Sequence, residues 1–147
     1  MKSNKKSKVR EQKNSKQLGL GVMIQMLGGN EETVEAFKNA VGKKIVKAEL
    51  DDDVIRIWFN KDKGIEIWDG GQSCCEHRYI TTDDNPSDLK GKKLTNIEIA
   101  DAPDGEGGEV HEVQFLRIHA EDEVVVFETH NEHNGYYGGF AVKIKEI

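Results

Sequence analysis

Two segments of the chain carry the residue types that most often do chemistry. The first, residues 70–78, contains two adjacent cysteines and a histidine, and thiolates and imidazoles are the ligands that zinc takes in proteins. Together with two later histidines, the candidate ligands are Cys74, Cys75, His77, His130 and His133. Structural zinc sites, however, usually pair their ligands across a knuckle, and adjacent residues of a strand point to opposite faces. We therefore expect no metal and no cofactor.

A nucleophilic role for these cysteines would need a base beside the thiolate and a third group that orients the base. His77 is close to Cys75 in the sequence, but no third residue is apparent. The chain also has no phosphate-binding glycine loop, nucleophile elbow or dinucleotide fingerprint. We expect that the protein is not an enzyme, and a metalloenzyme built on the cysteines and histidines stays as a third alternative.

The second segment, residues 130–139, combines two tyrosines with asparagine and glycine. Tyrosine rings give contact area at a low entropic cost, and asparagine with bare backbone offers hydrogen bonds to a polar ligand. A wide turn whose tyrosines cover a sheet edge explains the same composition equally well. Both interpretations stay open.

Arginine is scarce in the rest of the chain. After residue 17 there are only three arginines, Arg56, Arg78 and Arg117. Each lies within or beside an expected strand and can present a fork to a phosphate, which is a modest indication of an anion site. The acidic, glycine-rich loop 101–109 has oxygen atoms suited to calcium, but it lacks the spacing of the helix-flanked calcium loop. We expect it to be a solvated surface loop.

The net charge of −6 conceals a strong asymmetry along the 147 residues. Residues 1–17 hold seven of the 21 basic residues and one acid, so the remaining chain has 14 basic and 26 acidic residues. An acidic body argues against a nucleic-acid-binding face on it, because phosphate contacts need clustered lysine or arginine. The basic arm itself either contacts nucleic acid or an acidic partner, or serves as an unstructured solubilising tail.

The chain is long enough for one domain with a core of its own. Residues 1–16 have almost no apolar side chains and are predicted to be a disordered basic tail, followed by a single α+β domain over residues 17–147. Apolar spacing predicts two short helices within residues 17–41, with Val34, Phe37 and Val41 forming the apolar stripe of the second.

From residue 43 to residue 147 the apolar period changes to two, which predicts β structure. Short connections favour antiparallel pairing. The expected strands lie near residues 45–50, 54–59, 64–68, 77–81, 94–100, 113–118, 124–127 and 140–145. The predicted class is thus α+β, mainly β, with a seven- to eight-stranded, mostly antiparallel sheet or partly open barrel. We expect Trp58, Trp68, Phe115 and Phe127 to carry much of the core.

Adjacent cysteines rarely form a disulfide, so a reducing compartment is expected. The apolar stretch from Leu18 to Leu27 is interrupted by Gln25 and is too short to span a bilayer. We expect a cytoplasmic protein with no membrane contact.

Several short runs together resemble a family of small proteins encoded by phages and bacteria. They are the run Val41–Ile45, a strand ending in Trp-Phe, the double-cysteine segment Gly71–Glu76 and the run Asn134–Gly139. The pattern, over about residues 41–147, is similar to that of the phage Thoeris anti-defence proteins, which bind cyclic ADP-ribose-type immune signals as oligomers without degrading them.

The resemblance implies a phage-type anti-defence protein that sequesters a cyclic nucleotide signal in the host cytoplasm as a homo-oligomer, without catalysis. Aromatic faces would stack on adenine and arginines would bind the pyrophosphate. The residues expected to bind the ligand are Arg78, Arg117, Asn134, Tyr136 and Tyr137. The alternative is an acidic, anti-CRISPR-like inhibitor that binds a host defence nuclease, because clustered acids can occupy a phosphate-reading groove.

Overall fold

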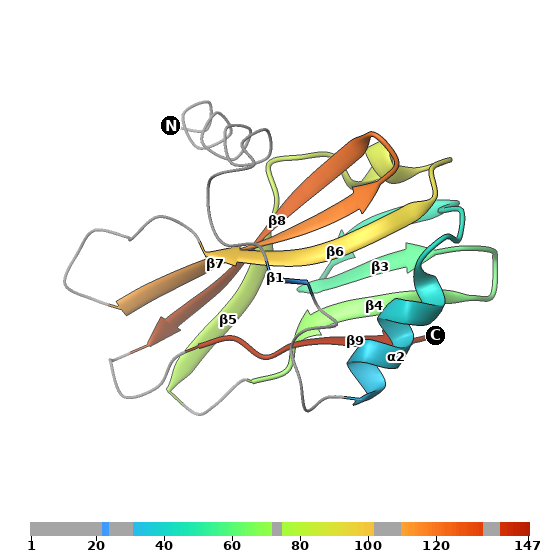
Figure 1. The fold of residues 1–147 in the computed structure, drawn as a ribbon. Helices are drawn as coiled ribbons and strands as arrows, with labels where there is room; N and C mark the ends of the chain where they lie inside the picture. Colours follow the sequence, from blue (N-terminus) through green and yellow to red (C-terminus); the bar gives the residue numbers. More distant parts are fainter. Residues whose placement is uncertain (1–21, 24–30, 72–74, 102–109, 134–138) are drawn as a thin grey trace.

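The computed structural model describes residues 22–23, 31–71, 75–101, 110–133 and 139–147 (Figure 1). The elements in chain order are β1 (Val22–Met23), α2 (Glu31–Ala40), β2 (Lys47–Asp51), β3 (Val54–Trp58), β4 (Gly64–Asp69), β5 (Glu76–Thr81), the 3-10 helix η2 (Pro86–Leu89), β6 (Leu94–Asp101), β7 (Val110–Ala120), β8 (Glu123–His133) and β9 (Val142–Glu146). The predicted mainly β class is confirmed.

The strands form two antiparallel sheets, where the sequence predicted one sheet or a partly open barrel. The larger sheet has the order β1-β6-β7-β8-β5, and the smaller has the order β2-β3-β4-β9. The difference arises because β9 leaves the final meander and pairs with β4, which sets Ile144 opposite Ile67. Both isoleucines are thereby buried, so apolar burial decides the pairing.

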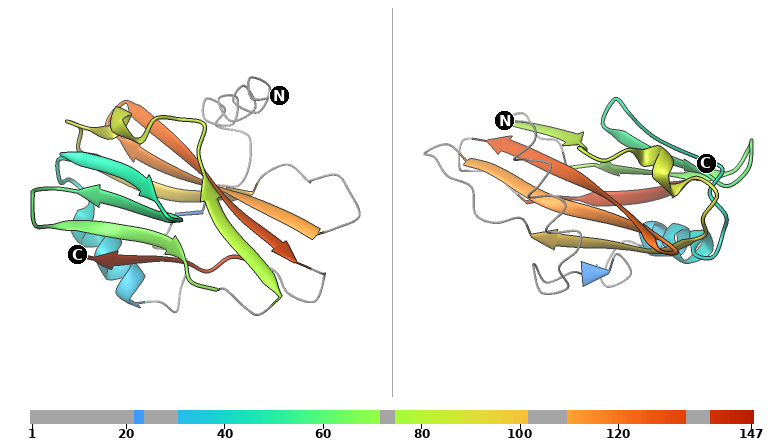
Figure 2. Two further views of the ribbon diagram at one scale, coloured as in Figure 1. Left: turned by 180° about the vertical axis from the view of Figure 1, so that it is seen from behind. Right: turned by 90° about the horizontal axis from the view of Figure 1, so that it is seen from above.

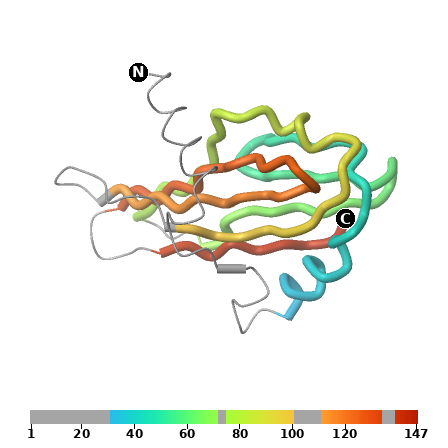
Figure 3. The backbone as a smooth tube through the Cα atoms, turned by 45° about the horizontal axis from the view of Figure 1, so that its top comes forward, coloured from blue at the N-terminus to red at the C-terminus, as the bar shows by residue number. Residues whose placement is uncertain are grey.

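The main core lies between the two sheets, and each sheet contributes one face to it (Figures 2 and 3). The smaller sheet buries the alternating isoleucines of β3 and β4, and the larger sheet buries Ile97, Leu116, Ile118 and Phe127. The prediction for Phe127 is therefore confirmed. Trp58 and Trp68 are only half-buried, because their strands turn the intervening isoleucines toward the core.

Helix α2 lies beside β9 and β4, near the C-terminal end of the described chain (Figure 1). Glu31 and Glu32 occupy its first turn, where the helix dipole favours negative charge. Its buried face consists of Thr33, Ala36, Phe37 and Ala40. The predicted stripe is thus right for Phe37 and wrong for Val41, which is 41% exposed, because the small alanines provide the surface that approaches the sheet.

The first predicted helix and the basic tail lie almost wholly outside the described residues. Val22 and Met23 are described, and they pair with Ile99 and Glu98 of β6 as a short edge strand. The helical expectation is therefore wrong for these two residues, since the free edge of β6 offers them backbone partners. No helix in the described part of the chain has the length and apolarity needed to cross a membrane.

Candidate functional site

The residues predicted to bind a ligand do not come together in one place. Arg78 lies on β5 opposite Asn131 of β8, and Arg117 lies on β7 opposite Val126 of β8. Asn131 and Val126 are an odd number of residues apart, so the two arginines point to opposite faces of the larger sheet. The other three predicted residues, at positions 134, 136 and 137, lie outside the described residues.

Arg78 is bound by two buried carboxylates. Its Nη1 lies 2.8 Å and 2.9 Å from the two carboxylate oxygens of Asp69, and its Nη2 lies 2.8 Å from Oε2 of Glu76. Burial opposes the charge on Arg78, but the hydrogen bonds to Glu76 and Asp69 outweigh it, so the pKa of Arg78 is raised. Because its fork is engaged within the protein, Arg78 serves as a structural ion pair in this arrangement.

Asn131 extends this network toward the end of β8. Its Nδ2 donates to Oε2 of Glu76 at 2.9 Å and to the carbonyl oxygen of Gly139 at 3.0 Å. Asn131 is fully buried, and its Oδ1 has no hydrogen-bond partner among the described residues. The network therefore links β4, β5 and β8 to Gly139.

Glu112 of β7 binds both His133 and Gly139, the described residues on either side of positions 134–138. One of its oxygens, Oε1, lies 2.8 Å from Nε2 of His133 and accepts a hydrogen bond from the backbone N–H of Gly139 at 3.0 Å. His133 directly precedes this segment and Gly139 directly follows it. A single carboxylate thus links the last residue of β8 to Gly139.

The opposite face of the same sheet end carries a cluster of rings. His77 and Tyr79 of β5 have ring centroids 4.8 Å apart, and Tyr79 stacks on His130 of β8 at 4.5 Å with an interplanar angle of 6°. His111 of β7 lies 5.2 Å from His130, centroid to centroid. We call His77, Tyr79, His111, His130 and Glu132 the ring cluster.

Hydrogen bonds join the ring cluster across three strands. Nε2 of His111 lies 2.9 Å from Nδ1 of His130, and Nε2 of His130 lies 2.8 Å from the hydroxyl oxygen of Thr81. The Thr81 hydroxyl can donate to Oε1 of Glu128 at 3.3 Å. With that donor assignment, His130 carries its proton on Nε2 and accepts from His111 through Nδ1.

Tyr79 keeps its proton strongly in this environment. Burial first, and then the hydrogen bond that its hydroxyl donates to Glu132, raise the pKa of Tyr79 to about 12. The same hydrogen bond is the main reason that the pKa of Glu132 is lowered. Tyr79 is consequently a neutral hydrogen-bonded ring at physiological pH, and Glu132 is an ionised acceptor.

Arg117 lies on the ring-cluster face but near the other end of β7. Its Nη1 lies 3.3 Å from Oε1 of Glu98, which is also 2.7 Å from Nε2 of His119. Only 6% of Arg117 is exposed. Like Arg78, it is engaged by a carboxylate of its own sheet.

The zinc ligands considered from sequence are divided between two faces. His77 and His130 belong to the ring cluster, whereas His133 binds Glu112 on the opposite face. Cys75 is exposed and is not part of a disulfide among the described residues, and Cys74 lies outside the described residues. Among the described residues, no group of three or more histidine, cysteine or acidic side chains is arranged to hold a metal ion.

Sequence reasoning missed Tyr79, His111 and Glu132 as members of one site. The available signal was the period of two, because His77 and Tyr79 in one strand, and His130 and Glu132 in another, must share a face. What the sequence did not supply was the register. Only the pairing of Tyr79 with His130, and of His111 with Glu132, turns the separate pairs into one cluster.

These elements define a two-sheet, mainly antiparallel α+β protein with a polar, ring-bearing site at one end of its larger sheet. The chain belongs to the family described as a domain of unknown function (DUF7448), whose model matches residues 38–142. The matched stretch contains the whole ring cluster and the Arg78 network. No curated protein and no solved structure matches the chain.

Proposed function

We propose that this protein binds and sequesters a small nucleotide-type signal, of the cyclic ADP-ribose class, without altering it chemically, and that it does so as a phage-type anti-defence protein in the host cytoplasm. The observation that carries the proposal is the position of the ring cluster. The cluster includes Glu132 near the end of β8, and the asparagine and tyrosines that are the predicted contacts follow β8 directly in the sequence, at positions 134, 136 and 137.

The cluster has the chemistry that such a ligand needs. His77 and His111 are exposed, and imidazole and phenol rings offer flat faces on which a nucleobase can stack. Imidazole N–H groups can donate to phosphate oxygens, and a protonated imidazole adds charge to that contact. The histidines would then bind the phosphate groups, which is the role that the sequence analysis expected for Arg78 and Arg117.

The acidic character of the chain is moderated at this end of the sheet. Glu76 is paired with Arg78, Glu112 binds His133, and Glu132 accepts from Tyr79. Carboxylates that are engaged within the protein repel an anionic ligand less than free ones would, because neighbouring positive charge or donors compensate them. A polyanionic ligand is therefore compatible with this part of an acidic protein.

Sequestration without catalysis is favoured by the way the reactive groups are engaged. Tyr79, with a pKa of about 12, is a poor general base at neutral pH. The Thr81 hydroxyl lies 2.8 Å from Nε2 of His130 and can donate to Glu128, and with that donor assignment His130 donates to the hydroxyl and does not act as its base. Binding is the activity that this arrangement supports best.

The proposal is tested by equilibrium dialysis of the purified protein against cyclic ADP-ribose isomers and cyclic dinucleotides. We expect one ligand of this panel to be retained, and His111→Ala to weaken its binding about tenfold or more, since a charge-assisted hydrogen bond contributes about 1.5–3 kcal/mol. His119→Ala is the matched control, because His119 lies on the same strand but bonds to Glu98 away from the cluster.

Retention of no member of the panel would overturn the nucleotide proposal. It would turn attention to the alternative of an acidic inhibitor that binds a host nuclease. A ligand held equally by the protein and by His111→Ala would place binding away from the ring cluster.

A further inference from the structure

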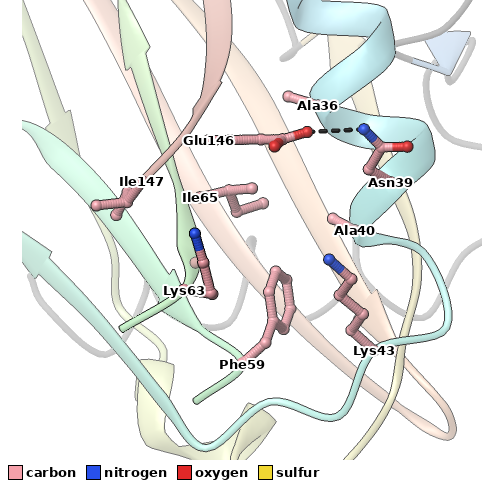
Figure 4. Close-up of a pocket in the computed structure, with 10 residues that line it drawn as sticks. Ala36, Asn39, Ala40, Lys43, Phe59, Lys63, Ile65, Glu146 and Ile147 are labelled. Carbon is pink, nitrogen blue, oxygen red and sulfur yellow. Dashed lines mark hydrogen bonds between the residues drawn. The ribbon is translucent and has the colours of Figure 1, made fainter. Parts of the chain in front are cut away.

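A small hollow lies far from the ring cluster, where helix α2 meets the smaller sheet (Figure 4). Apolar groups of Ala36, Ala40, Phe59, Ile65 and Ile147 form much of its lining. The polar lining consists of Asn39, Lys43, Lys63 and Glu146. The four polar residues come from α2, from β9, and from the segments that follow α2 and β3.

The polar groups divide the hollow into a negative side and a positive side (Figure 4). On one side Nδ2 of Asn39 donates to Oε1 of Glu146 at 2.8 Å, which leaves the second Glu146 oxygen and the Asn39 carbonyl as acceptors. On the other side the ammonium groups of Lys43 and Lys63 flank the Phe59 ring. The Lys43 ammonium lies 5.7 Å from the ring centroid.

The two lysines retain their capacity to bind an anion. Neither forms an ion pair with any residue that the structure describes. Lysine presents three rotatable donors at the end of a flexible stem, so both can converge on one carboxylate. A carboxylate held there would place any adjacent ammonium group near the Glu146 and Asn39 oxygens.

The size of the hollow limits what it can hold. Its volume is about 60 Å³. A cavity needs about 10–15 Å³ to hold one water-sized group, so the hollow has room for a few such groups. The ammonium group and the carboxylate of an amino acid are groups of this size, and the rest of such a ligand would lie outside the hollow.

We infer that this hollow is a binding site for the charged groups of a small zwitterion of the α-amino acid class. Lys43 and Lys63 bind its carboxylate, and Glu146 and Asn39 accept from its ammonium group. The site is independent of the proposed nucleotide function, since none of its residues belongs to the ring cluster or to the Arg78 network.

Ligand-observed NMR with the full chain tests this inference, because the method detects weak binding at exposed sites. The probes are L-leucine, N-acetyl-L-leucine, which lacks the ammonium charge, and L-leucinamide, which lacks the carboxylate. We expect L-leucine to bind and each of the two derivatives to bind at least about threefold more weakly, since an exposed charge contact contributes up to about 1 kcal/mol.

Two substitutions test the two sides separately. Lys63→Gln and Glu146→Gln should each weaken L-leucine binding about three- to fivefold. Lys61→Gln and Glu35→Gln are the matched controls, because these exposed residues lie on neighbouring segments outside the hollow, and they should leave binding unchanged. All four side chains are exposed, so circular dichroism should confirm that each variant folds.

No L-leucine binding, or equal binding of L-leucine and its two derivatives, would overturn the inference. Equal weakening by the substitutions and by their controls would also overturn it. Because cyclic nucleotide retention is measured at the other end of the molecule, loss of either result leaves the other unaffected.

Discussion

The guanidinium of Arg78 joins the two sheets of the protein through Asp69. Arg78 belongs to β5 of the larger sheet and Asp69 to β4 of the smaller one, and their side chains are 7% and 4% exposed. Oδ1 of Asp69 also accepts from the backbone N–H groups of Gly71 and Ala141 at 3.1 Å. The pair therefore links β5 to the backbone on which Gly71 and Ala141 lie.

Replacing Arg78 should destabilise the fold strongly. Arg78→Met leaves the carboxylates of Asp69 and Glu76 buried without their cation, which costs about 3–5 kcal/mol. Urea denaturation measures the loss of unfolding free energy. Arg56→Met is the control, because Arg56 forms the same fork with Glu66 and Asp51 but at the surface, and it should cost much less. Equal losses for the two variants would contradict the structural role given to Arg78.

The Tyr79 hydroxyl should produce a pH dependence of stability at alkaline pH. Its pKa in the folded protein is about 12, against the ordinary tyrosine pKa of 10.0. Because folding raises this pKa, the protonated hydroxyl contributes to the free energy of unfolding. That contribution is fully present below pH 10 and is lost as the pH rises from 10 toward 12. Tyr79→Phe should remove this part of the pH dependence in denaturant titrations between pH 9 and pH 12.

Ultraviolet titration of tyrosinate checks the same assignment directly. Of the three tyrosines in the chain, one should ionise near pH 12, and that late step should be absent in Tyr79→Phe. Titration of all three tyrosines near their ordinary pKa of about 10 would show that the hydrogen bond to Glu132 does not hold in solution.

The sequence predicted local structure well and long-range pairing poorly, for physical reasons that particular residues show. The alternation in β3 and β4 is visible in the isoleucines themselves, because a strand with one buried face must alternate. The pairing of β9 with β4 depends on which distant strand buries Ile144, and no local pattern carries that information.

The candidate site shows the same limit. Arg78 was expected to contact a phosphate because an unpaired arginine in a strand can do so, but its partner Asp69 lies nine residues earlier and across the gap between two sheets. The ring cluster required the register of three strands. Its members were visible in the sequence only as isolated histidines and one tyrosine.

Gly64 and Gly70 should respond differently to the same substitution. A Cβ at Gly64 would lie 2.4 Å from the carbonyl oxygen of Ile57, which is backbone of the paired strand and cannot move aside. A Cβ at Gly70 would meet the flexible side chain of Lys143 at 2.9 Å. Gly64→Ala should therefore cost about 1–3 kcal/mol of stability, as overpacking does.

Thermal denaturation of Gly64→Ala beside Gly70→Ala measures the difference. The Gly70 variant should change the melting temperature little, since the Lys143 stem can rotate away. If the Gly70 variant were the less stable of the two, the pairing of β3 with β4 at Gly64 would have to differ from the one described here.

Removing the carboxylate of Glu112 should loosen His133 and Gly139, the two residues that it contacts. Glu112→Ala deletes the acceptor of the Gly139 amide, so hydrogen exchange at Gly139 should accelerate. Glu98→Ala is the control. Like Glu112, Glu98 binds a histidine, in this case His119 of β7, but among the described residues it makes no hydrogen bond to Gly139. Unchanged exchange in Glu112→Ala, or equal acceleration in both variants, would remove Glu112 from this role.

Native mass spectrometry of the protein after incubation with cyclic ADP-ribose isomers and cyclic dinucleotides tests the central claim most directly. We predict a mass increase equal to one intact ligand per site, strongly reduced in His111→Ala and unchanged in His119→Ala, with the same spectrum counting the subunits of the expected homo-oligomer. A bound fragment in place of the intact ligand would indicate catalysis. No mass increase with any member of the panel would contradict the proposal that this protein sequesters a nucleotide signal.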